Sequence, residues 1–279
     1  MSDANSYAFP MGGIPEQSQL TTDTAVFTDA YAVIPAGVMR DIVTSYLPFW
    51  EGMRAWVLAR PLSGFAETFS QLAVELKPGG GSDRPELDEG IECVLFVTSG
   101  QVVVSFDGDE HTLDCGGYAF IPPGQSWSIW NRDPHAKATF QWVRKRYQAV
   151  EGLEAPKAFV AHEMDTLPLA TDSRSLIWTT HRFVDPTDMR HDMHVNIVTI
   201  QPGGSIPFAE THVMEHGLYM LQGKAVYRLN RDWVEVEAGD FLWLRAFCPQ
   251  ACVASGDVPF KYLLYKDVNR HPSGGIGGL

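Results

Sequence analysis

The segment ETHVMEHG, residues 210–217, concentrates side chains that bind metals or move protons. Glu210, His212 and His216 stand at positions i, i+2 and i+6 within it. Side chains at even spacing along a β-strand point to one face, so a strand here would present one carboxylate and two imidazoles together. The three residues are therefore either ligands of one metal ion or a chance cluster, and the surrounding sequence distinguishes the two.

The elements that would carry these side chains are β-strands. Apolar residues alternate with polar ones, or run in short blocks, between turns rich in Gly, Pro, Asn and Asp. Clear examples are residues 70–81, 101–113, 195–204 and 224–236. This pattern is typical of an antiparallel all-β protein.

The chain also aligns with itself when it is shifted so that Gly100 falls on Gly223. Equivalent turn positions then coincide without a gap over about fifty residues: Gly81 with Gly204, Gly100 with Gly223, Asp107 with Asn230, and Gly116 with Gly239. The repeat predicts two similar β-barrels in tandem. We divide them into residues 1–155, an N-terminal arm with the first barrel, and residues 156–279, the second barrel.

The C-terminal repeat resembles the paired motifs of the cupin family, whose fold is a double-stranded β-helix or jelly-roll barrel. Its first motif reads Gly204-x5-Glu210-x-His212-x3-His216-x6-Gly223, with the motif spacing complete and the ligand types permuted. In the second motif, Gln250 stands where the family usually has His. The resemblance therefore implies four candidate metal ligands in this barrel.

The N-terminal repeat keeps the second cupin motif as Gly116-x5-Pro122-x-Gly124-x2-Trp127-x3-Asn131 but has lost the ligands. Its ligand positions hold Leu87, Glu89, Cys93 and Trp127. We expect this barrel to keep the fold without a metal, with Leu87 and Trp127 filling the space with apolar atoms.

The candidate ligand set of the C-terminal barrel is Glu210, His212, His216 and Gln250. Two imidazoles, a carboxylate and an amide oxygen suit Mn²⁺, Fe²⁺, Co²⁺, Ni²⁺ or Zn²⁺, and the set alone does not choose among them. On an octahedral ion, four protein ligands leave two positions for substrate and water. A net positive site would favour an anionic substrate. Cys248 and Cys252 flank Gln250 and are alternative thiol ligands, and we treat the remaining seven histidines as ordinary residues.

The C-terminal half is similar in more detail to the (S)-ureidoglycine aminohydrolases, bicupin enzymes of purine (ureide) catabolism. The similarity lies in ETHVMEHGLYMLQGKAVYRLNRDWVEVEAGDFLWL, CPQACVA and KYLLYKDVNRHP, and further segments extend it over most of residues 70–272. The family resemblance implies one Mn²⁺ per chain, bound in the C-terminal barrel by Glu210, His212, His216 and Gln250. It further implies a higher homo-oligomer and the hydrolysis of (S)-ureidoglycine to (S)-ureidoglycolate and ammonia.

The same resemblance places three further residues at the substrate: Tyr227, Tyr262 and Lys266. Lys266 could neutralise the substrate carboxylate or give a proton to departing ammonia, and a lowered pKa would help that transfer. The tyrosines could orient the substrate, and Glu210 could accept a proton from the attacking water. The alternatives are a solvated edge charge for Lys266 and barrel-wall positions for the tyrosines.

Two acidic neighbours of the motif have less defined roles. Glu215 lies at odd spacing between the ligands, so we expect its side chain to point away from them. Asp192, in the segment HDMHVNI, could support the site from a neighbouring strand.

Composition narrows the class of protein. The 279 residues carry a net charge of −13 and no block of Lys and Arg, which argues against a nucleic-acid or anionic-membrane surface. The N-terminus lacks the pattern of a secretory signal, no apolar run approaches membrane-spanning length, and the four cysteines form no CxxC pair. We therefore expect a cytoplasmic protein with reduced thiols.

Two other functions fit a bicupin. One is a different metal enzyme, such as a decarboxylase, dioxygenase or isomerase, but those families more often show His-x-His with a later Glu and His. The other is a non-enzymatic binding or storage protein, which predicts eroded ligands in both halves, whereas the second half keeps all four.

Overall fold

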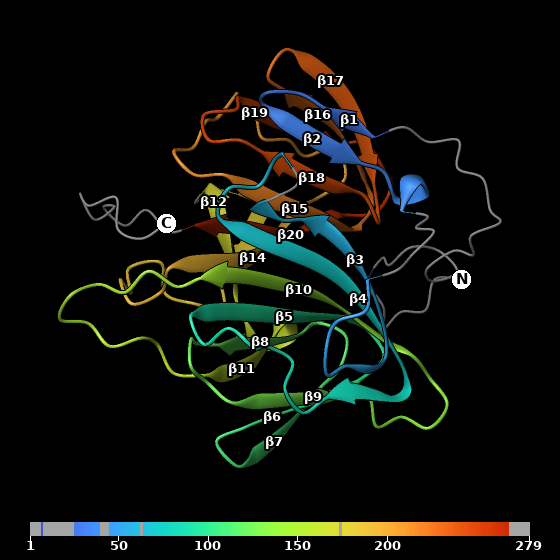
Figure 1. The fold of residues 1–279 in the computed structure, drawn as a ribbon. Coiled ribbons are helices and arrows are strands. Elements are labelled where there is room, and N and C mark those ends of the chain that lie inside the picture. Colours follow the sequence, from blue (N-terminus) through green and yellow to red (C-terminus); the bar gives the residue numbers. More distant parts are fainter. Residues whose placement is uncertain (1–6, 8–24, 40–44, 62–63, 173–174, 268–279) are drawn as a thin grey trace.

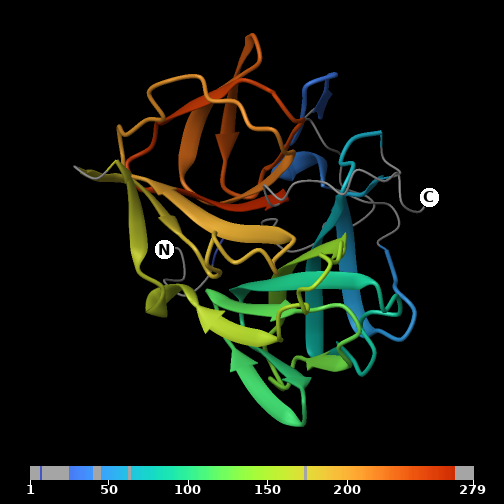
Figure 2. The same ribbon diagram turned by 90° about the vertical axis from the view of Figure 1, so that its left-hand side faces the viewer.

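The computed structural model describes residue 7 and residues 25–39, 45–61, 64–172 and 175–267. Almost all of the regular structure is β-strand, as two barrels that stack on each other (Figure 1; Figure 2 shows the same pair from the side). The N-terminal barrel is drawn mainly in green and the C-terminal barrel in orange and red. The predicted all-β architecture of two tandem cupin barrels is confirmed.

The N-terminal barrel is built on a sheet with the strand order β11-β8-β5-β10-β4-β9-β6-β7, to which β3 adds by pairing with β4. Its strands are β3 (Glu51–Ala59), β4 (Phe69–Ser82), β5 (Ile91–Ser99), β6 (Val102–Phe106), β7 (Asp109–Leu113), β8 (Gly117–Ile121), β9 (Trp127–Trp130), β10 (Ala138–Arg146) and β11 (Phe159–His162). All of the pairings are antiparallel, as the alternating pattern predicts.

The C-terminal barrel combines a sheet of order β1-β2-β18-β15-β20-β14-β13-β12 with a three-stranded sheet of order β17-β16-β19. Its strands are β1 (Val26–Phe27), β2 (Tyr31–Ile34), β12 (Pro168–Asp172), β13 (Ser175–His181), β14 (Met193–Ile200), β15 (His216–Gln222), β16 (Lys224–Leu229), β17 (Asp232–Glu237), β18 (Phe241–Leu244), β19 (Gln250–Ala254) and β20 (Phe260–Asp267). Two short 3-10 helices, η1 (Ala36–Val38) and η3 (Glu163–Asp165), complete the described elements.

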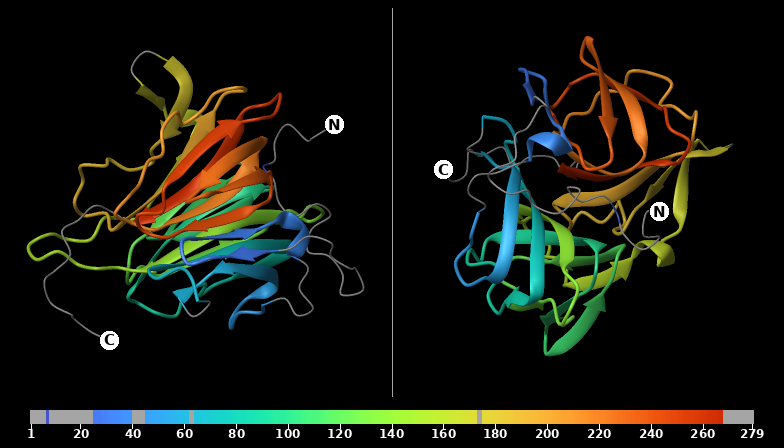
Figure 3. Two further views of the ribbon diagram at one scale, coloured as in Figure 1. Left: turned by 90° about the horizontal axis from the view of Figure 1, so that it is seen from above. Right: turned by 90° about the vertical axis from the view of Figure 1, so that its right-hand side faces the viewer.

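Strand pairing crosses the expected division between residues 155 and 156 in both directions. Strand β2, from the N-terminal arm, pairs with β18 of the C-terminal barrel, where the blue hairpin lies beside the orange strands (Figure 3). Strand β11, which follows the division, pairs with β8 of the N-terminal barrel. The division by sequence repeat stays a prediction. The C-terminal barrel takes the hairpin β1–β2 from the other half of the chain, and the N-terminal barrel takes the edge strand β11.

The internal repeat is visible in matching turns. Asp107 and Asn230 both adopt positive φ, 54° and 56°, in the turns after β6 and β16. Gly100 and Gly223 also have positive φ, and a Cβ on either would lie 2.4 or 2.6 Å from a backbone carbonyl oxygen of the facing segment. Only glycine fits such a position, so the two aligned glycines do the same structural task in each barrel.

Three apolar clusters follow from the alternation of side chains. One fills the N-terminal barrel, one fills the floor of the C-terminal barrel, and the largest lies between the barrels. On β20, Leu263 and Tyr265 pack into the cluster between the barrels, whereas Phe260 and Tyr262 pack inside the C-terminal barrel. Because successive side chains of a strand point to opposite faces, β20 contributes to both apolar clusters.

Candidate active site

The C-terminal barrel contains a cavity of about 180 Å³. Its walls come from β13, β14, β15, β19 and β20 and from the segment before β15. The lining residues are Trp178, Thr180, Arg182, Asn196, Val198, Glu210, His212, Met214, His216, Leu218, Gln250, Tyr262, Leu264 and Lys266. Six of the seven residues proposed from sequence as ligands or catalytic groups are among them, and Tyr227 is not.

Backbone pairing sets the position of the candidate ligands. Glu210 and Gln250 form an isolated antiparallel bridge, in which each backbone N–H donates to the carbonyl of the other at 2.9 Å. The N–H of Phe247 donates to the carbonyl of His212 at 2.7 Å. His216 is the first residue of β15. The predicted continuous strand is therefore replaced by a bridge, a short loop and a strand, which still direct all four side chains into one cavity.

The four candidate ligands divide into an inner and an outer pair. His216 and Gln250 are buried, with 4% and 5% of their surfaces exposed, whereas the side chains of His212 and Glu210 are 34% and 19% exposed. Nε2 of His212 lies 3.6 Å from Oε1 of Glu210, and the two imidazole centroids are 4.8 Å apart. The side chains thus converge on one end of the cavity.

Burial controls the charge of His216. Its pKa is lowered to about 3, first by loss of solvent and then by the neighbouring His212 and Lys266. The imidazole is therefore neutral at physiological pH, the form that coordinates metals. Its buried Nδ1 has no hydrogen-bond partner among the residues that the structure describes.

The four side chains offer donor atoms that suit a divalent metal ion. Their spacing in this structure, however, does not match that of a metal site. Neutral imidazole, carboxylate and amide oxygen form the mixed set expected for a first-row ion. Within the described ranges, however, no three His, Cys, Asp or Glu side chains are grouped as they would be around a metal. The convergence of the donors and the unpartnered Nδ1 of His216 are the structural observations that favour a metal here.

Lys266 lies next to the candidate ligands because of strand register. It pairs with His216 across β15 and β20, and with His194 across β20 and β14. Burial lowers the pKa of Lys266, with Arg182 adding to that effect and Asp267 opposing it. The lysine is a cavity-facing cation with a weakened hold on its proton, and not a solvated edge charge.

The two tyrosines occupy different depths. Tyr262 lines the cavity, whereas Tyr227 is fully buried behind it, with ring centroids 6.5 Å apart in an edge-to-face arrangement. Burial holds the pKa of both phenols well above the usual value, so both are neutral donors. Of the two, Tyr262 lines the cavity and Tyr227 does not, so the substrate contact expected of Tyr227 stays a prediction.

The sequence motifs do not identify three polar residues of the cavity: Arg182, Asn196 and Thr180. They lie outside the cupin motifs, on β13, β14 and the residue that follows β13. The alternation of side chains along a strand could have identified them. The cavity is lined by every second residue of two segments, namely 178, 180 and 182, and 196 and 198. His194, expected to be an ordinary residue, is buried on β14 beside Lys266.

Glu215 points away from the candidate ligands, as predicted. Its carboxylate accepts hydrogen bonds from the backbone N–H groups of Glu67 and Thr68, at 2.9 and 2.5 Å, and from the indole of Trp243 at 2.7 Å. These contacts join the C-terminal barrel to the segment before β4. Glu215 therefore fastens one barrel to the other.

Asp192 does not line the cavity. It forms a buried ion pair with Lys145 and accepts a hydrogen bond from the backbone N–H of Gln148. Its contacts, like those of Glu215, connect the two barrels.

Neither cysteine near Gln250 lines the cavity. Cys252 is buried on the inner face of β19, where desolvation raises its pKa to about 12, and Cys248 is also buried. A thiol of such high pKa is protonated at neutral pH, and the thiolate is the form that binds metal. The geometry favours Gln250 over either thiol.

The N-terminal barrel has no histidine at its ligand positions, and Leu87, Glu89 and Trp127 line a pocket there. Cys93 and Trp127 belong to its apolar interior, and Trp127 packs edge-on against Trp142. The expectation that Leu87 fills the empty ligand space is wrong, because 48% of Leu87 is exposed at the barrel mouth. The bulk of the two tryptophans and the neighbouring Phe140 fills the interior without it.

Comparisons with known proteins agree with this architecture. Residues 196–265 match the cupin domain family, and residues 63–147 match the EutQ-like cupin domain family. The chain is 61% identical to a crystal structure described as the "Putative Glyoxylate Induced Protein" from Pseudomonas aeruginosa, with a TM-score of 0.88 and coverage of 98% of this chain and 99% of that one.

Curated relatives connect the fold to an activity. The (S)-ureidoglycine aminohydrolase of Escherichia coli (strain K12) is 31% identical over 85% of this chain and 87% of its own length. A relative from Oryza sativa subsp. japonica, described as a probable (S)-ureidoglycine aminohydrolase, is 31% identical over 82% of this chain and 71% of its own. The likeness spans both barrels, and the chain belongs to the (S)-ureidoglycine aminohydrolase family.

Proposed function

We propose that the chain is a Mn²⁺-dependent hydrolase that converts (S)-ureidoglycine and water to (S)-ureidoglycolate and ammonia. The observation that carries the proposal is one cavity in which Glu210, His212, His216 and Gln250 converge beside the cavity-facing cation Lys266. The names of the curated relatives support the substrate. The family resemblance further predicts a homo-oligomer, and composition favours a cytoplasmic location.

Glu210, His212, His216 and Gln250 would hold one Mn²⁺ per chain. When bound, the ion would act as a Lewis acid that fixes the substrate and lowers the pKa of water. His216 and Gln250 are buried and would form the fixed inner side of the site, whereas Glu210 and His212 face the opening.

The chain's own residues would handle the protons. Glu210 is the proposed acceptor for the proton of the attacking water, because it is the cavity's carboxylate and is partly exposed. Lys266 either neutralises the substrate carboxylate or gives a proton to the leaving amino group, and its lowered pKa favours the second role near neutral pH. Tyr262 would donate a hydrogen bond that orients the substrate, with Tyr227 packed behind it.

The walls of the cavity are partly apolar. Leu218, Leu264 and Val198 line it between the polar groups, and the buried residues Leu242 and Phe260 lie in the apolar cluster beneath. Charges that face partly apolar walls interact more strongly than they would in bulk water.

The test is ammonia release. Ureidoglycine is generated in situ from allantoate with an allantoate amidohydrolase, and wild-type protein loaded with Mn²⁺ is compared with His212→Ala. The proposal predicts a second ammonia together with (S)-ureidoglycolate for wild type alone. Equal release by both proteins at the spontaneous rate of ureidoglycine decay would refute the assigned substrate.

A further inference from the structure

Arg182 is the second cation of the cavity. It follows directly after β13, lines the cavity together with Asn196 and Lys266, and is exposed at the opening. In the part of the chain that the structure describes, no hydrogen bond or ion pair holds its guanidinium group. A cavity-lining arginine in this condition can accept a ligand without first breaking a bond within the protein.

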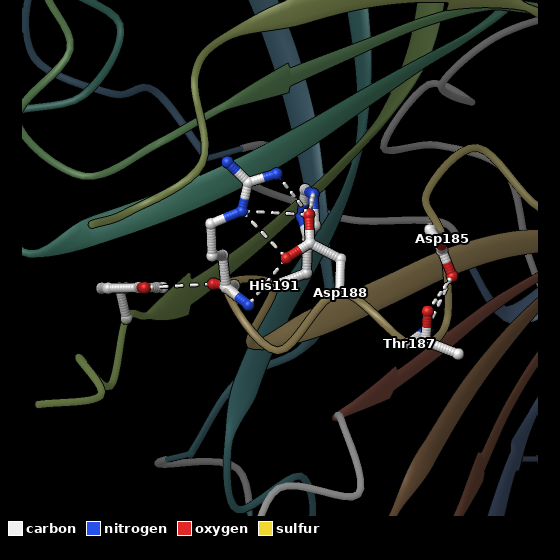
Figure 4. Close-up of polar contacts among 6 residues, drawn as sticks. Asp185, Thr187, Asp188 and His191 are labelled. Carbon is white, nitrogen blue, oxygen red and sulfur yellow. Dashed lines mark hydrogen bonds and ion pairs between the residues drawn. The ribbon is translucent and has the colours of Figure 1, made fainter. Parts of the chain in front are cut away.

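The nearest acidic side chains along the chain are already engaged. Figure 4 shows the loop between β13 and β14, in which Asp185 accepts from the hydroxyl of Thr187 at 2.7 Å. Asp188 accepts from the guanidinium of Arg190 at 2.6 and 2.9 Å. The carboxylates of Asp185 and Asp188 therefore have hydrogen-bond partners within the loop. The positive charge of Arg182 is left to act on the cavity.

Strand order brings the cations to one wall. The order β15-β20-β14-β13 places Lys266 between His216 and His194, with Arg182 at the end of the next strand. Burial lowers the pKa of His194 to about 4, so this histidine adds no charge at neutral pH. The positive charge on this wall comes from Lys266 and Arg182.

We propose that Arg182 is a specificity-determining residue that binds the carboxylate group of the substrate at the mouth of the cavity. A guanidinium group matches a carboxylate with two parallel hydrogen bonds, and a local cation also attracts an anion to a protein of net charge −13. The inference rests on the proposed function for the identity of the substrate. It also chooses between the two roles proposed for Lys266. Because Arg182 binds the carboxylate, Lys266 is left to give a proton to the departing ammonia.

The experiment measures binding of two stable compounds to the Mn²⁺-loaded full-length chain by calorimetry. N-Carbamoylglycine carries the ureido and carboxylate groups of the substrate without its amino group, and its amide is the neutral counterpart. The variants are Arg182→Gln, Arg182→Lys and the control Arg231→Gln. Arg231 is exposed in the turn between β16 and β17, does not line the cavity and changes the net charge equally.

We expect Arg182→Gln to weaken binding of N-carbamoylglycine about tenfold, the scale of one partly exposed charge-assisted contact. Binding of the neutral amide should stay within about twofold of wild type, Arg182→Lys should recover part of the loss, and Arg231→Gln should bind both compounds as wild type does. Equal losses for acid and amide, no loss for the acid, or no binding of either compound by wild type would overturn the inference.

The two proposals fail separately. If Arg182→Gln loses the acid selectively but wild type releases no ammonia from ureidoglycine, carboxylate recognition stands and the proposed substrate is wrong. If wild type hydrolyses ureidoglycine and Arg182→Gln discriminates acid from amide as wild type does, the reaction stands and the role of Arg182 is wrong.

Discussion

Replacing Glu215 by Gln tests whether the acidic residue beside His216 is structural. In the native protein both carboxylate oxygens accept: Oε1 from the N–H and hydroxyl of Thr68, and Oε2 from the indole of Trp243 and the N–H of Glu67. An amide keeps one acceptor and turns an N–H₂ group toward the remaining donors. Trp243 is 3% exposed and Thr68 is half-buried, so in either orientation of the amide the N–H of one of them loses its acceptor.

The magnitude follows from the hydrogen bonds that the amide cannot accept. A hydrogen bond to a charged group contributes about 1.5–3 kcal/mol, and an orphaned buried donor costs a similar amount. We therefore expect the free energy of unfolding to fall by about 2–4 kcal/mol, which lowers the Tm of a chain of this size by about 5–10 °C.

The assay is thermal unfolding followed by circular dichroism, with metal content measured on the same samples. Glu237→Gln is the matched control, because its ion pair with Lys224 is exposed on both sides and its loss should leave the Tm close to the wild-type value. Mn²⁺ content should stay at the wild-type level for both variants. A Glu215→Gln protein with unchanged Tm, or one that folds normally and loses the metal, would refute the structural role.

Four further variants address the cavity and the neighbouring Asp267. Lys266→Met should lower kcat by about 10²-fold or more, the scale of one general acid, while metal content stays unchanged; a wild-type kcat would exclude proton donation by Lys266. Tyr262→Phe should lower kcat more than Tyr227→Phe, because only Tyr262 lines the cavity, and the reverse order in steady-state assays would contradict the geometry. Burial and the nearby Glu215 raise the pKa of Asp267 to about 6. The contribution of Asp267 to stability is therefore greatest below about pH 4 and is lost as the pH rises through about 6, so Asp267→Asn should become more stable relative to wild type between about pH 4 and pH 7. If the urea-unfolding midpoints of the two proteins show no such trend with pH, the pH dependence does not come from Asp267.

The alternation of side chains made the fold and the candidate ligands predictable. Glu210, His212 and His216 line one cavity as even spacing predicts, although a loop at residues 211–215 replaces the expected continuous strand. The aligned glycines identified the repeat because a β-carbon at Gly100 or Gly223 would collide with facing backbone. Both signals are local, and a single sequence displays them directly.

The remaining features depend on contacts between distant segments. Nothing in the short strands β2 and β11 specifies a partner, and their pairing with the opposite barrel becomes visible only in three dimensions. Arg182 lies outside the motifs and reaches the cavity because β13 follows β14 in the sheet order. The exposure of Leu87 could not be predicted because interior volume depends on neighbours such as Trp142, which the ligand motif does not include.

The most direct test of the account is the stoichiometry of Mn²⁺ in the two barrels. The chain is stripped with a chelator, reloaded and measured by elemental analysis, with ureidoglycine hydrolysis recorded on the same samples. The account predicts one Mn²⁺ per chain for wild type and for the N-terminal variant Glu89→Gln, and loss of both metal and activity for His212→Ala. Loss of metal from Glu89→Gln, or retention of metal and activity by His212→Ala, would contradict it.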